Sequence, residues 1–459
     1  MSATTNHINN FTNVYFIGIG GIGMSALARY FKQKGAAVSG YDRTETALTK
    51  ELEKTGITII YTEDVDALPE DADLIVYTPA IPASNKLLQF YLTNNNYNVV
   101  KRSDVLQWLT ESSFNICVGG THGKTTTSTM VAHILMSSGF GCNAFLGGIS
   151  ANYNTNFLSY NGDVCVIEAD EYDRSFLKLS PDIAIITAMD ADHLDIYGTA
   201  EEVENAYVQF SHKIKAGGTL ISHFNLKRKD ALYQAKNITY NLTNPGADVY
   251  VENVRVINGG YVFDVIDRQW SLKNVTLNMG GLHNIENCIA AITVAKQLKI
   301  SDEKVKAAIE TFAGVKRRFE YIIKTDEQVL IDDYAHHPEE LKALISGVRS
   351  LYADKKITIV FQPHLFSRTN DLAAEFAESL SLADDIILLP VYPARELPIP
   401  GVTSDIILQK INNNNKYLLS KNEMKQWITD KKPGLVVMAG AGDIDILVND
   451  VKNILDNNK

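Results

Sequence analysis

Cysteine is scarce in this sequence, and its spacing gives no sign of a metal site. The chain has four cysteines in 459 residues, and none forms a C-x-x-C pair. Most of them sit within apolar stretches, as buried thiols do in a reducing compartment. The pattern argues against a disulfide framework and against a cysteine-bound zinc ion. The four are Cys117, Cys142, Cys165 and Cys288.

Long apolar runs and basic clusters are also missing. No hydrophobic stretch approaches the ~20 residues that span a bilayer, and Met1 to Asn10 is polar. The 54 acidic side chains outnumber the 43 Lys and Arg, and the net charge of -11 repels phosphate backbones because no basic stripe offsets it. We therefore expect a cytoplasmic protein that binds neither membranes nor nucleic acids. A hydrophobic share of 45% predicts a folded chain.

Strands and helices alternate in successive series, which predicts an α/β fold. The first series runs from Val14 to about Arg102, with a helix at Ile22 to Lys34, and the second begins at Phe114. A period-two pattern between about Asn237 and Met279, with a Gly259-Gly260 turn, predicts an antiparallel appendage. The expected strands before it are "VYFIG", "AAVSGY", "DLIVYT", "NVVKR", "FNICV", "DVCVIE" and "DIAIIT".

Two helices, at about Asn284 to Leu298 and Ser301 to Phe312, precede a third series of "QVLID", "ITIVFQ", "DIILLP", "GLVVMAG" and a terminal helix. Gly314 interrupts the pattern between them, and we place a domain boundary there. The prediction is a Rossmann-like domain at 1–107, a central P-loop ATPase-like α/β domain with the appendage at 108–314, and a C-terminal Rossmann-like domain at 315–459.

The first glycine cluster follows a strand and opens a helix. Gly18, Gly20 and Gly23 have the G-x-G-x-x-G spacing that lets a backbone approach a diphosphate at a helix N-terminus. Asp42, at the end of the next strand, is placed to bond a ribose hydroxyl. The residues alone favour NAD or FAD, leaving another nucleotide diphosphate or a ligand-free turn as alternatives.

A second glycine loop has the order of a P-loop. In "CVGGTHGKTTT" the backbone amides would cradle phosphates, Lys124 would reach the β and γ oxygens, and the Thr125 hydroxyl would bind Mg2+. The usual spacing requires glycine where Val118 stands, so the loop is one residue shorter, counted from Gly119.

Acidic residues and a histidine follow the next two strands, where open α/β sheets bind ligands. Glu168 ends an apolar strand, a costly place for an unpaired charge that Mg2+ would neutralise. His193 follows the next strand and is a candidate ligand near a second metal. The alternatives are a solvated acidic loop and a structural histidine. The neighbouring acids are Asp170, Glu171, Asp173, Asp190, Asp192 and Asp195.

Seven ordered motifs together resemble the Mur ligases, which build the peptide stem of bacterial cell-wall precursors. The resemblance runs from Phe16 to Ile444. It implies UDP-N-acetylmuramate, L-alanine and ATP as substrates and Mg2+ as cofactor. It also implies that the carboxylate is activated as an acyl phosphate. The motifs "DDYAHHP" and "GVKRRFE" favour alanine over a preformed peptide or another amino acid as the group that is added. The motifs are "GTHGKTTT", "EADEYDRSF", "DADHLDIYG", "GLHNIENCIAA", "GVKRRFE", "DDYAHHPEE" and "FQPHLFSRT".

The resemblance also implies roles for individual residues in the first two domains. It assigns the first glycine loop to the UDP of the sugar rather than to NAD. Asn284 and Asn287, three apart on one helix face, would recognise adenine; the alternative is an N-cap at Asn284 and a solvent-facing Asn287. UDP would contact Gly18, Gly20, Gly21, Gly23 and Asp42; ATP would contact Gly119, Gly120, Thr121, His122, Gly123, Lys124, Thr125 and Thr126; the metal ligands would be Thr125, Glu168 and His193.

In the third domain the resemblance places Arg318 at the γ-phosphate and Asp333 at the ribose or phosphate, with Arg317 as a surface neighbour and Asp332 a weaker candidate. L-alanine would contact Tyr334, His336, His337, His364 and Arg368, and Arg368 can clamp a carboxylate with two hydrogen bonds. Other members often carry a second arginine where Leu365 stands. No role follows for Arg395 or Glu396.

The catalytic residues expected on this basis are Lys124, His193, Arg318 and Asp333. Because they come from two domains, the site is expected to assemble on domain closure, with a hinge near Gly314. The oligomeric prediction is a monomer or weak homodimer. An NAD-dependent dehydrogenase and an ATP-driven switch are the alternatives from other classes.

Overall fold

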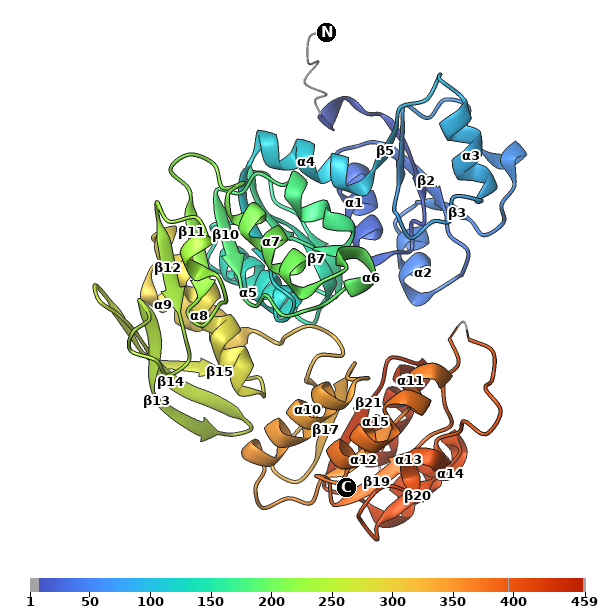
Figure 1. The fold of residues 1–459 in the computed structure, drawn as a ribbon, viewed down its shortest axis with the longest axis vertical. Helices are drawn as coiled ribbons and strands as arrows, with labels where there is room; N and C mark the ends of the chain where they lie inside the picture. The colour runs from blue at the N-terminus through green and yellow to red at the C-terminus, as the bar shows by residue number, and fades with distance from the viewer. Residues whose placement is uncertain (1–7, 395, 457–459) are drawn as a thin grey trace. The chain divides into compact units, whose positions relative to one another are not determined.

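The computed structural model describes residues 8–394 and 396–456, which form a three-domain α/β fold with one sheet in each domain. These residues group into two compact units (Figure 1). The first comprises residues up to 252 together with 265–273 and 286–309, and it holds the N-terminal sheet and most of the central one. The second comprises 253–264, 274–285 and 310 onward, and it holds the C-terminal sheet. No helix of the described residues is long and apolar enough to cross a membrane.

The N-terminal sheet is parallel with the order β3-β2-β1-β4-β5. The order reverses at β1, so the loop after β1 lies at the switch point where such sheets bind ligands. The predicted strands are confirmed, and β3 adds a three-residue strand that was too short to predict. The bounds are β1 Asn13–Ile17, α1 Ile22–Gln33, β2 Ala37–Tyr41, α2 Ala47–Lys54, β3 Thr58–Ile60, β4 Leu74–Tyr77, α3 Lys86–Thr93, β5 Val99–Lys101 and α4 Arg102–Ser112.

Helix α1 joins the N-terminal and central domains within the first unit. Tyr30 packs against Phe31 on one side and against Phe145 and Phe157 of the central domain on the other, at ring-centroid distances of 5.5 to 6.0 Å. The buried Asn156 donates to the carbonyl of Ile22 at 2.6 Å. The first turn of α1 is therefore held by a side chain of the central domain, and its later turns pack against rings of that domain.

The central sheet has the order β15-β14-β13-β12-β11-β10-β6-β9-β7-β8, and β6 lies parallel between β9 and β10. The carboxyl ends of these strands meet at one edge, where the P-loop leaves β6. The bounds are β6 Phe114–Gly119, α5 Lys124–Ser137, β7 Asn143–Ser150, β8 Thr155–Leu158, β9 Val164–Glu168, η3 Tyr172–Lys178, β10 Ile183–Ile186, α6 Leu194–Tyr197, α7 Ala200–Ser211, β11 Thr219–His223, β12 Asn237–Tyr240, β13 Val249–Ile257, β14 Gly260–Asp267, β15 Ser271–Leu277, α8 Leu282–Gln297 and α9 Asp302–Thr311.

The appendage begins later than predicted. β12 pairs parallel with β11, so it belongs to the parallel sheet, and a four-residue strand carries too little periodicity to reveal this. β13, β14 and β15 extend the sheet beyond it (Figure 1). The turn between β13 and β14 is Asn258-Gly259, one residue earlier than expected, and both residues have positive φ (50° and 65°), as a two-residue type I′ hairpin turn requires.

The C-terminal sheet has the order β16-β17-β21-β18-β19-β20 and is parallel except for β16. Its four predicted strands and its terminal helix are confirmed. The bounds are β16 Glu320–Lys324, β17 Val329–Asp333, α10 Pro338–Leu351, β18 Thr358–Phe361, α11 Phe366–Asp371, α12 Ala373–Leu380, β19 Asp385–Leu388, α13 Asp405–Leu408, β20 Lys416–Leu418, α14 Lys421–Lys431, β21 Leu435–Ala439 and α15 Val448–Asp456.

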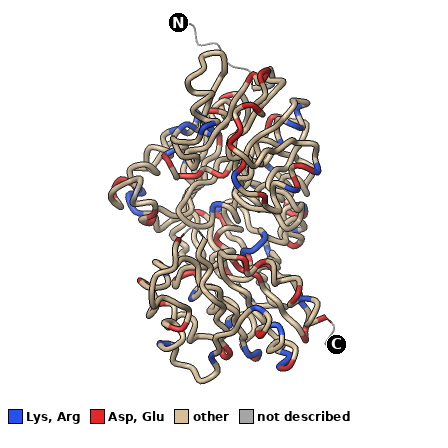
Figure 2. Tube along the Cα trace, turned by 90° about the vertical axis from the view of Figure 1, so that its right-hand side faces the viewer, with Lys and Arg blue, Asp and Glu red and all other residues tan. Residues whose placement is uncertain are grey.

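Charged side chains of both signs are dispersed through the fold. Figure 2 shows Lys and Arg scattered among Asp and Glu along the trace rather than gathered into one stripe. Local pairs of opposite charge, not a broad field, therefore dominate the electrostatics of the sites described below.

Candidate functional site

The loop between β6 and α5 has the backbone of a phosphate-binding turn. Gly120 has φ +137°, and a Cβ there would lie 2.0 Å from the hydroxyl of Thr187; Gly123 has φ +80°, and a Cβ there would lie 2.5 Å from the Asn287 amide oxygen. A side chain is excluded at both positions. The loop amides and the N-terminus of α5 can thus approach an anion closely. Within the loop, Thr121 is buried, and the His122 side chain is 76% exposed.

Lys124 and Thr125, the first residues of α5, each contact a different acid. The Lys124 ammonium lies 2.7 Å from the Gly120 carbonyl and 2.8 Å from the carboxylate of Glu171, which is 1% exposed. The Thr125 hydroxyl donates to Glu168 at 3.0 Å. The amide of Gly147 and the hydroxyl of Ser128 also donate to Glu168, at 2.9 and 3.4 Å. Two buried or half-buried carboxylates therefore face the P-loop.

His193, which was expected near a second metal, lies beside Glu171 and Asp192. Its Nε2 is 3.9 Å from Glu171 and 3.8 Å from Asp192, and ligand atoms of these three residues lie within 4.8 Å of one another. The Tyr197 hydroxyl donates to the Glu171 carbonyl at 2.6 Å and fixes this residue. The Glu171 carboxylate also lies beside the buried hydroxyl of Tyr207, and burial together with this carboxylate raises the pKa of that phenol.

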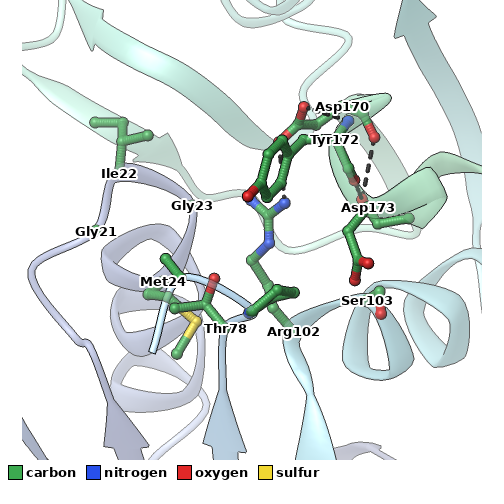
Figure 3. Close-up of a pocket in the computed structure, with 13 residues that line it drawn as sticks. Gly21, Ile22, Gly23, Met24, Thr78, Arg102, Ser103, Asp170, Tyr172 and Asp173 are labelled. Carbon is green, nitrogen blue, oxygen red and sulfur yellow. Dashed lines mark hydrogen bonds and ion pairs between the residues drawn. The ribbon is translucent and has the colours of Figure 1, made fainter. Parts of the chain in front are cut away.

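The first glycine loop lines a pocket of about 200 Å³ within the first unit (Figure 3). Its walls are residues 21–24 of the loop and α1, residues 78–80 after β4, Arg102 and Ser103 of α4, and four residues of the segment 170–175. The Asp42 carboxylate accepts hydrogen bonds from the amides of Gly20 at 2.8 Å and Thr44 at 3.2 Å. Asp42 therefore supports the glycine loop itself, and this bond occupies one loop amide.

Asn284 and Asn287 are both buried in α8. Asn287 accepts a hydrogen bond from the Thr127 hydroxyl at 3.1 Å, beside the P-loop. Asn284 donates to the Gly280 carbonyl at 2.6 Å. The alternative of an N-cap and a solvent-facing side chain is wrong, because α8 begins two residues before Asn284 and packing covers the face that carries both amides.

In the second unit, Arg317 is a half-buried anchor, with 19% of its side chain exposed, rather than the surface neighbour that was predicted. Its guanidinium lies 3.4 Å from Asp332 and 3.7 Å from Asp445, and 5.1 Å from the centre of the Tyr334 ring. Arg318 is the exposed member of the pair. The sequence shows two adjacent arginines and does not distinguish them; in the structure Arg317 has a positive φ of 59°.

The acids at the end of β17 are held by burial and by the backbone. Asp333 accepts from the amides of Phe319 and Ala335, both at 2.7 Å. Burial raises the pKa of Asp333 to about 6, although these hydrogen bonds and the charge of Arg318 oppose the rise. Burial likewise raises the pKa of Asp332 to about 7, against the opposing charge of Arg317. The hydrogen bond from the Phe319 amide to Asp333 connects the loop that carries Arg318 to the end of β17.

Replacing Asp332 by asparagine is expected to change how stability depends on pH. The pKa of this carboxyl is raised from 3.8 to about 7, so between these pH values the folded chain retains a proton that the unfolded chain has released. Unfolding then becomes easier as pH rises through this window, by up to about 1.4 kcal/mol per pH unit. When thermal unfolding is measured from pH 4 to 8, the Asp332→Asn variant should lack this loss of stability with rising pH. The exposed Asp326→Asn is the matched control, and equal pH profiles for wild type and Asp332→Asn would contradict the assignment.

Four of the five residues predicted to contact alanine lie together. The His336 ring is 5.2 Å from the Tyr334 ring and 6.2 Å from the His364 ring, and Arg368 lies 3.5 Å from the His336 carbonyl. His337 instead caps α10, where its Nδ1 accepts from the amide of Glu339. Leu365, with φ 71°, is the N-cap residue of α11. Arg395 lies outside the described residues, and Glu396 accepts a hydrogen bond from the Ser367 amide at 3.0 Å.

Models of one protein family match almost the whole chain. The Mur ligase family catalytic domain matches residues 13–113, the Mur ligase middle domain matches 118–295, and the Mur ligase glutamate ligase domain matches 317–442. The chain belongs to the Mur ligase family. Its similarity to individual Mur ligases extends over the full length. It is 48% identical over 455 residues to UDP-N-acetylmuramate–L-alanine ligase of Parabacteroides distasonis, covering 98% of each chain, and 46% identical to that of Cytophaga hutchinsonii, covering 97% of each.

Solved Mur ligase structures have the same fold. The crystal structure of UDP-N-acetylmuramate–alanine ligase from Thermotoga maritima superimposes with a TM-score of 0.82 at 27% identity, covering 98% of this chain and 100% of that one. A murein peptide ligase from Psychrobacter arcticus shares the fold, with a TM-score of 0.63 at 23% identity, over 97% of this chain and 99% of that one. The family assignment therefore agrees with the three-domain architecture.

Sequence reasoning did not select three residues that contact the loops and the pocket described above. Glu171 was one of several acids behind Glu168, and only its burial against Lys124 distinguishes it. Arg102 ends a predicted strand, and nothing local indicates its contact with Asp170, 68 residues away. Arg317 could not be distinguished from Arg318. Each of the three acquires its place through a tertiary contact.

Proposed function

We propose that this chain joins L-alanine to the lactyl carboxylate of UDP-N-acetylmuramate, converting ATP to ADP and phosphate, in the synthesis of peptidoglycan precursors. The observation that carries the proposal is the P-loop whose Lys124 and Thr125 contact Glu171 and Glu168 at the carboxyl edge of the central sheet. The full-length similarity to enzymes named for this reaction supports the choice of substrates. The boundaries after residues 107 and 314 are part of the proposal, with Gly314, at φ +89°, as the hinge.

ATP is needed because a carboxylate is a poor electrophile. The carboxylate oxygen attacks the γ-phosphorus, the bond to the β-phosphate oxygen breaks, and ADP leaves. The amine of alanine then attacks the acyl carbon, phosphate leaves with the bonding electrons, and the amine loses a proton. Lys124 and Arg318 are the residues proposed to offset the repulsion between the anions. The imidazoles of His193, His336 and His337 are candidates to accept the proton.

The residues near the P-loop fit Mg2+. The Thr125 hydroxyl and the Glu168 carboxylate are 3.0 Å apart and supply the hard oxygen ligands that this ion prefers. Glu171, Asp192 and His193 form the second group of donors. When bound, Mg2+ would neutralise phosphate charge. Asn284 and Asn287 are proposed to recognise adenine, and Asp333 to position the nucleotide.

The decisive experiment measures ADP formation with purified protein, ATP and Mg2+. We expect strict dependence on both UDP-N-acetylmuramate and L-alanine, with serine, glycine and a tripeptide as comparison substrates. A faster reaction with the tripeptide would favour a peptide-adding ligase. ATP hydrolysis that needs no UDP-sugar would favour a switch. Saturable fluorescence titration by NADH would favour a dehydrogenase.

Replacing Arg368 by alanine is expected to raise the KM for L-alanine by roughly ten- to a hundredfold, because a charge-assisted pair to the substrate carboxylate is lost. The KM for ATP should change by about twofold or less. Arg349→Ala is the control in the same unit. It removes an arginine of α10 that is paired with Asp384. Equal effects of Arg368→Ala on the two KM values would place Arg368 elsewhere.

A further inference from the structure

The pocket at the first glycine loop contains one cation in an otherwise acidic setting. Of the 13 residues that line it, only Arg102 carries a positive charge, whereas Asp170 and Asp173 are negative. A diphosphate bound by loop amides alone would face these two carboxylates. A neighbouring cation is needed to offset that repulsion.

The Arg102 guanidinium lies against the glycine loop. Arg102 is the first residue of α4, and its Nη1 is 2.1 Å from the point where a Cβ on Gly23 would stand. The absence of a side chain at Gly23 therefore makes room for the guanidinium beside the N-terminus of α1. Figure 3 shows the side chain reaching from α4 into the space between this loop and Asp170. With 20% of its side chain exposed, Arg102 is accessible to a ligand in the pocket.

Asp170 holds the guanidinium in this position. Its Oδ2 accepts from Nη2 of Arg102 at 3.2 Å, and its Oδ1 accepts from the amide of Tyr172 at 3.1 Å. Two more ion pairs, Lys101 with Asp173 and Lys178 with Asp104, connect the start of α4 to the same segment. Because one side of the guanidinium already binds Asp170, the side chain is held in place. Its remaining N–H donors can then bind a ligand with little further loss of side-chain entropy.

We propose that Arg102 is the residue that binds the diphosphate of the sugar nucleotide, and that Asp170 is its positioning residue. The inference rests on the proposed function, because that function places a UDP-sugar at this loop. Asp170 lies between Glu168 and Glu171, which contact the P-loop residues, so the pair also links the sugar pocket to the segment that serves the nucleotide site.

The test compares the affinities for UDP and for uridine, which lacks the diphosphate, by calorimetry on the full chain. Arg102→Met should raise the Kd for UDP by roughly ten- to a hundredfold, the usual effect of losing a charge-assisted contact, and leave the Kd for uridine within about twofold. Asp170→Asn should raise the Kd for UDP by a smaller factor. Lys54→Met, which removes an exposed cation of α2 that is paired with Glu51 outside the pocket, should leave both Kd values unchanged.

A second variant keeps the test decisive if Arg102→Met does not fold. Gly23→Ala places a methyl group where Nη1 lies and should displace the guanidinium without removing it, so it too should weaken UDP more than uridine. An unchanged ratio of the UDP and uridine Kd values in the folded variants would overturn the assignment of Arg102. An Asp170→Asn variant that matches wild type would overturn the positioning role.

The two levels of inference fail separately. If wild-type protein forms ADP only with UDP-N-acetylmuramate and alanine, yet the Arg102→Met and Gly23→Ala ratios are unchanged, the proposed function stands and Arg102 is not the diphosphate ligand. If wild-type protein forms no ADP under those conditions, the proposed function itself fails. The ratio of the UDP and uridine Kd values would then describe binding of a nucleotide that is not part of a ligase substrate.

Discussion

Replacing Lys124 by alanine is expected to lower ADP formation by at least about a hundredfold, the usual cost of removing one preorganised charge at a phosphoryl-transfer site. The Lys124 ammonium opens α5 and lies 2.7 Å from a P-loop carbonyl. The measurement is ADP release at saturating UDP-N-acetylmuramate and L-alanine, with UDP binding as a check that the first domain is intact.

The same substitution has a second effect, on stability, because it leaves the Glu171 carboxylate without its cation. Glu171 is 1% exposed, and removing one member of a buried pair typically costs about 3–5 kcal/mol. The double variant Lys124→Ala/Glu171→Gln neutralises the remaining charge. It should recover much of the stability and none of the activity, which separates a catalytic loss from misfolding.

A matched lysine controls for the loss of an ion pair. Lys215 is paired with Asp182 at 2.9 Å at the opposite end of the strands, where β10 begins. Lys215→Ala should reduce stability and retain ligation. If Lys124→Ala kept substantial activity, or if Lys215→Ala lost as much, the P-loop assignment would be wrong.

The sequence alone predicted the elements whose signal is local. Alternating apolar runs and helices indicated three α/β domains, and the glycine loops marked the carboxyl ends of β1 and β6. β7 and β8 were not predicted, because their pairing closes over a short turn with a register shift and lacks regular alternation. The start of the appendage was misplaced because β12, which belongs to the parallel sheet, has only four residues and shows too little alternation to be assigned.

Partners distant in the chain could not be predicted. Arg102 pairs with Asp170, Lys124 with Glu171, and Arg317 with Asp332. Each pair forms because the fold places two loops or element ends that are distant in the chain next to each other. No spacing rule selects these partners from several nearby charges. The family resemblance named the loops that carry the chemistry, and the structure added the residues that orient it.

Replacing Glu168 by glutamine is expected to raise the Mg2+ concentration that gives half-maximal ADP formation by at least about tenfold and to lower turnover by about a hundredfold. Glutamine has nearly the same shape. Its amide oxygen can accept from the Gly147 amide, and its NH2 group can donate to the Thr125 hydroxyl oxygen, so the local fold should persist while the charge is lost. The absence of a side chain at Gly147 lets the carboxylate approach this closely, because a Cβ there would lie 2.2 Å from it.

The Mg2+ titration distinguishes a ligand from a structural acid. Asp163→Asn removes an exposed acid just before β9, the strand that ends at Glu168, and should leave the titration unchanged. His193→Ala should shift the titration less than Glu168→Gln, because Glu171 and Asp192 remain as donors. A Glu168→Gln variant with the wild-type Mg2+ requirement would show that this carboxylate only braces Thr125. The metal would then have to be held by the group around Glu171.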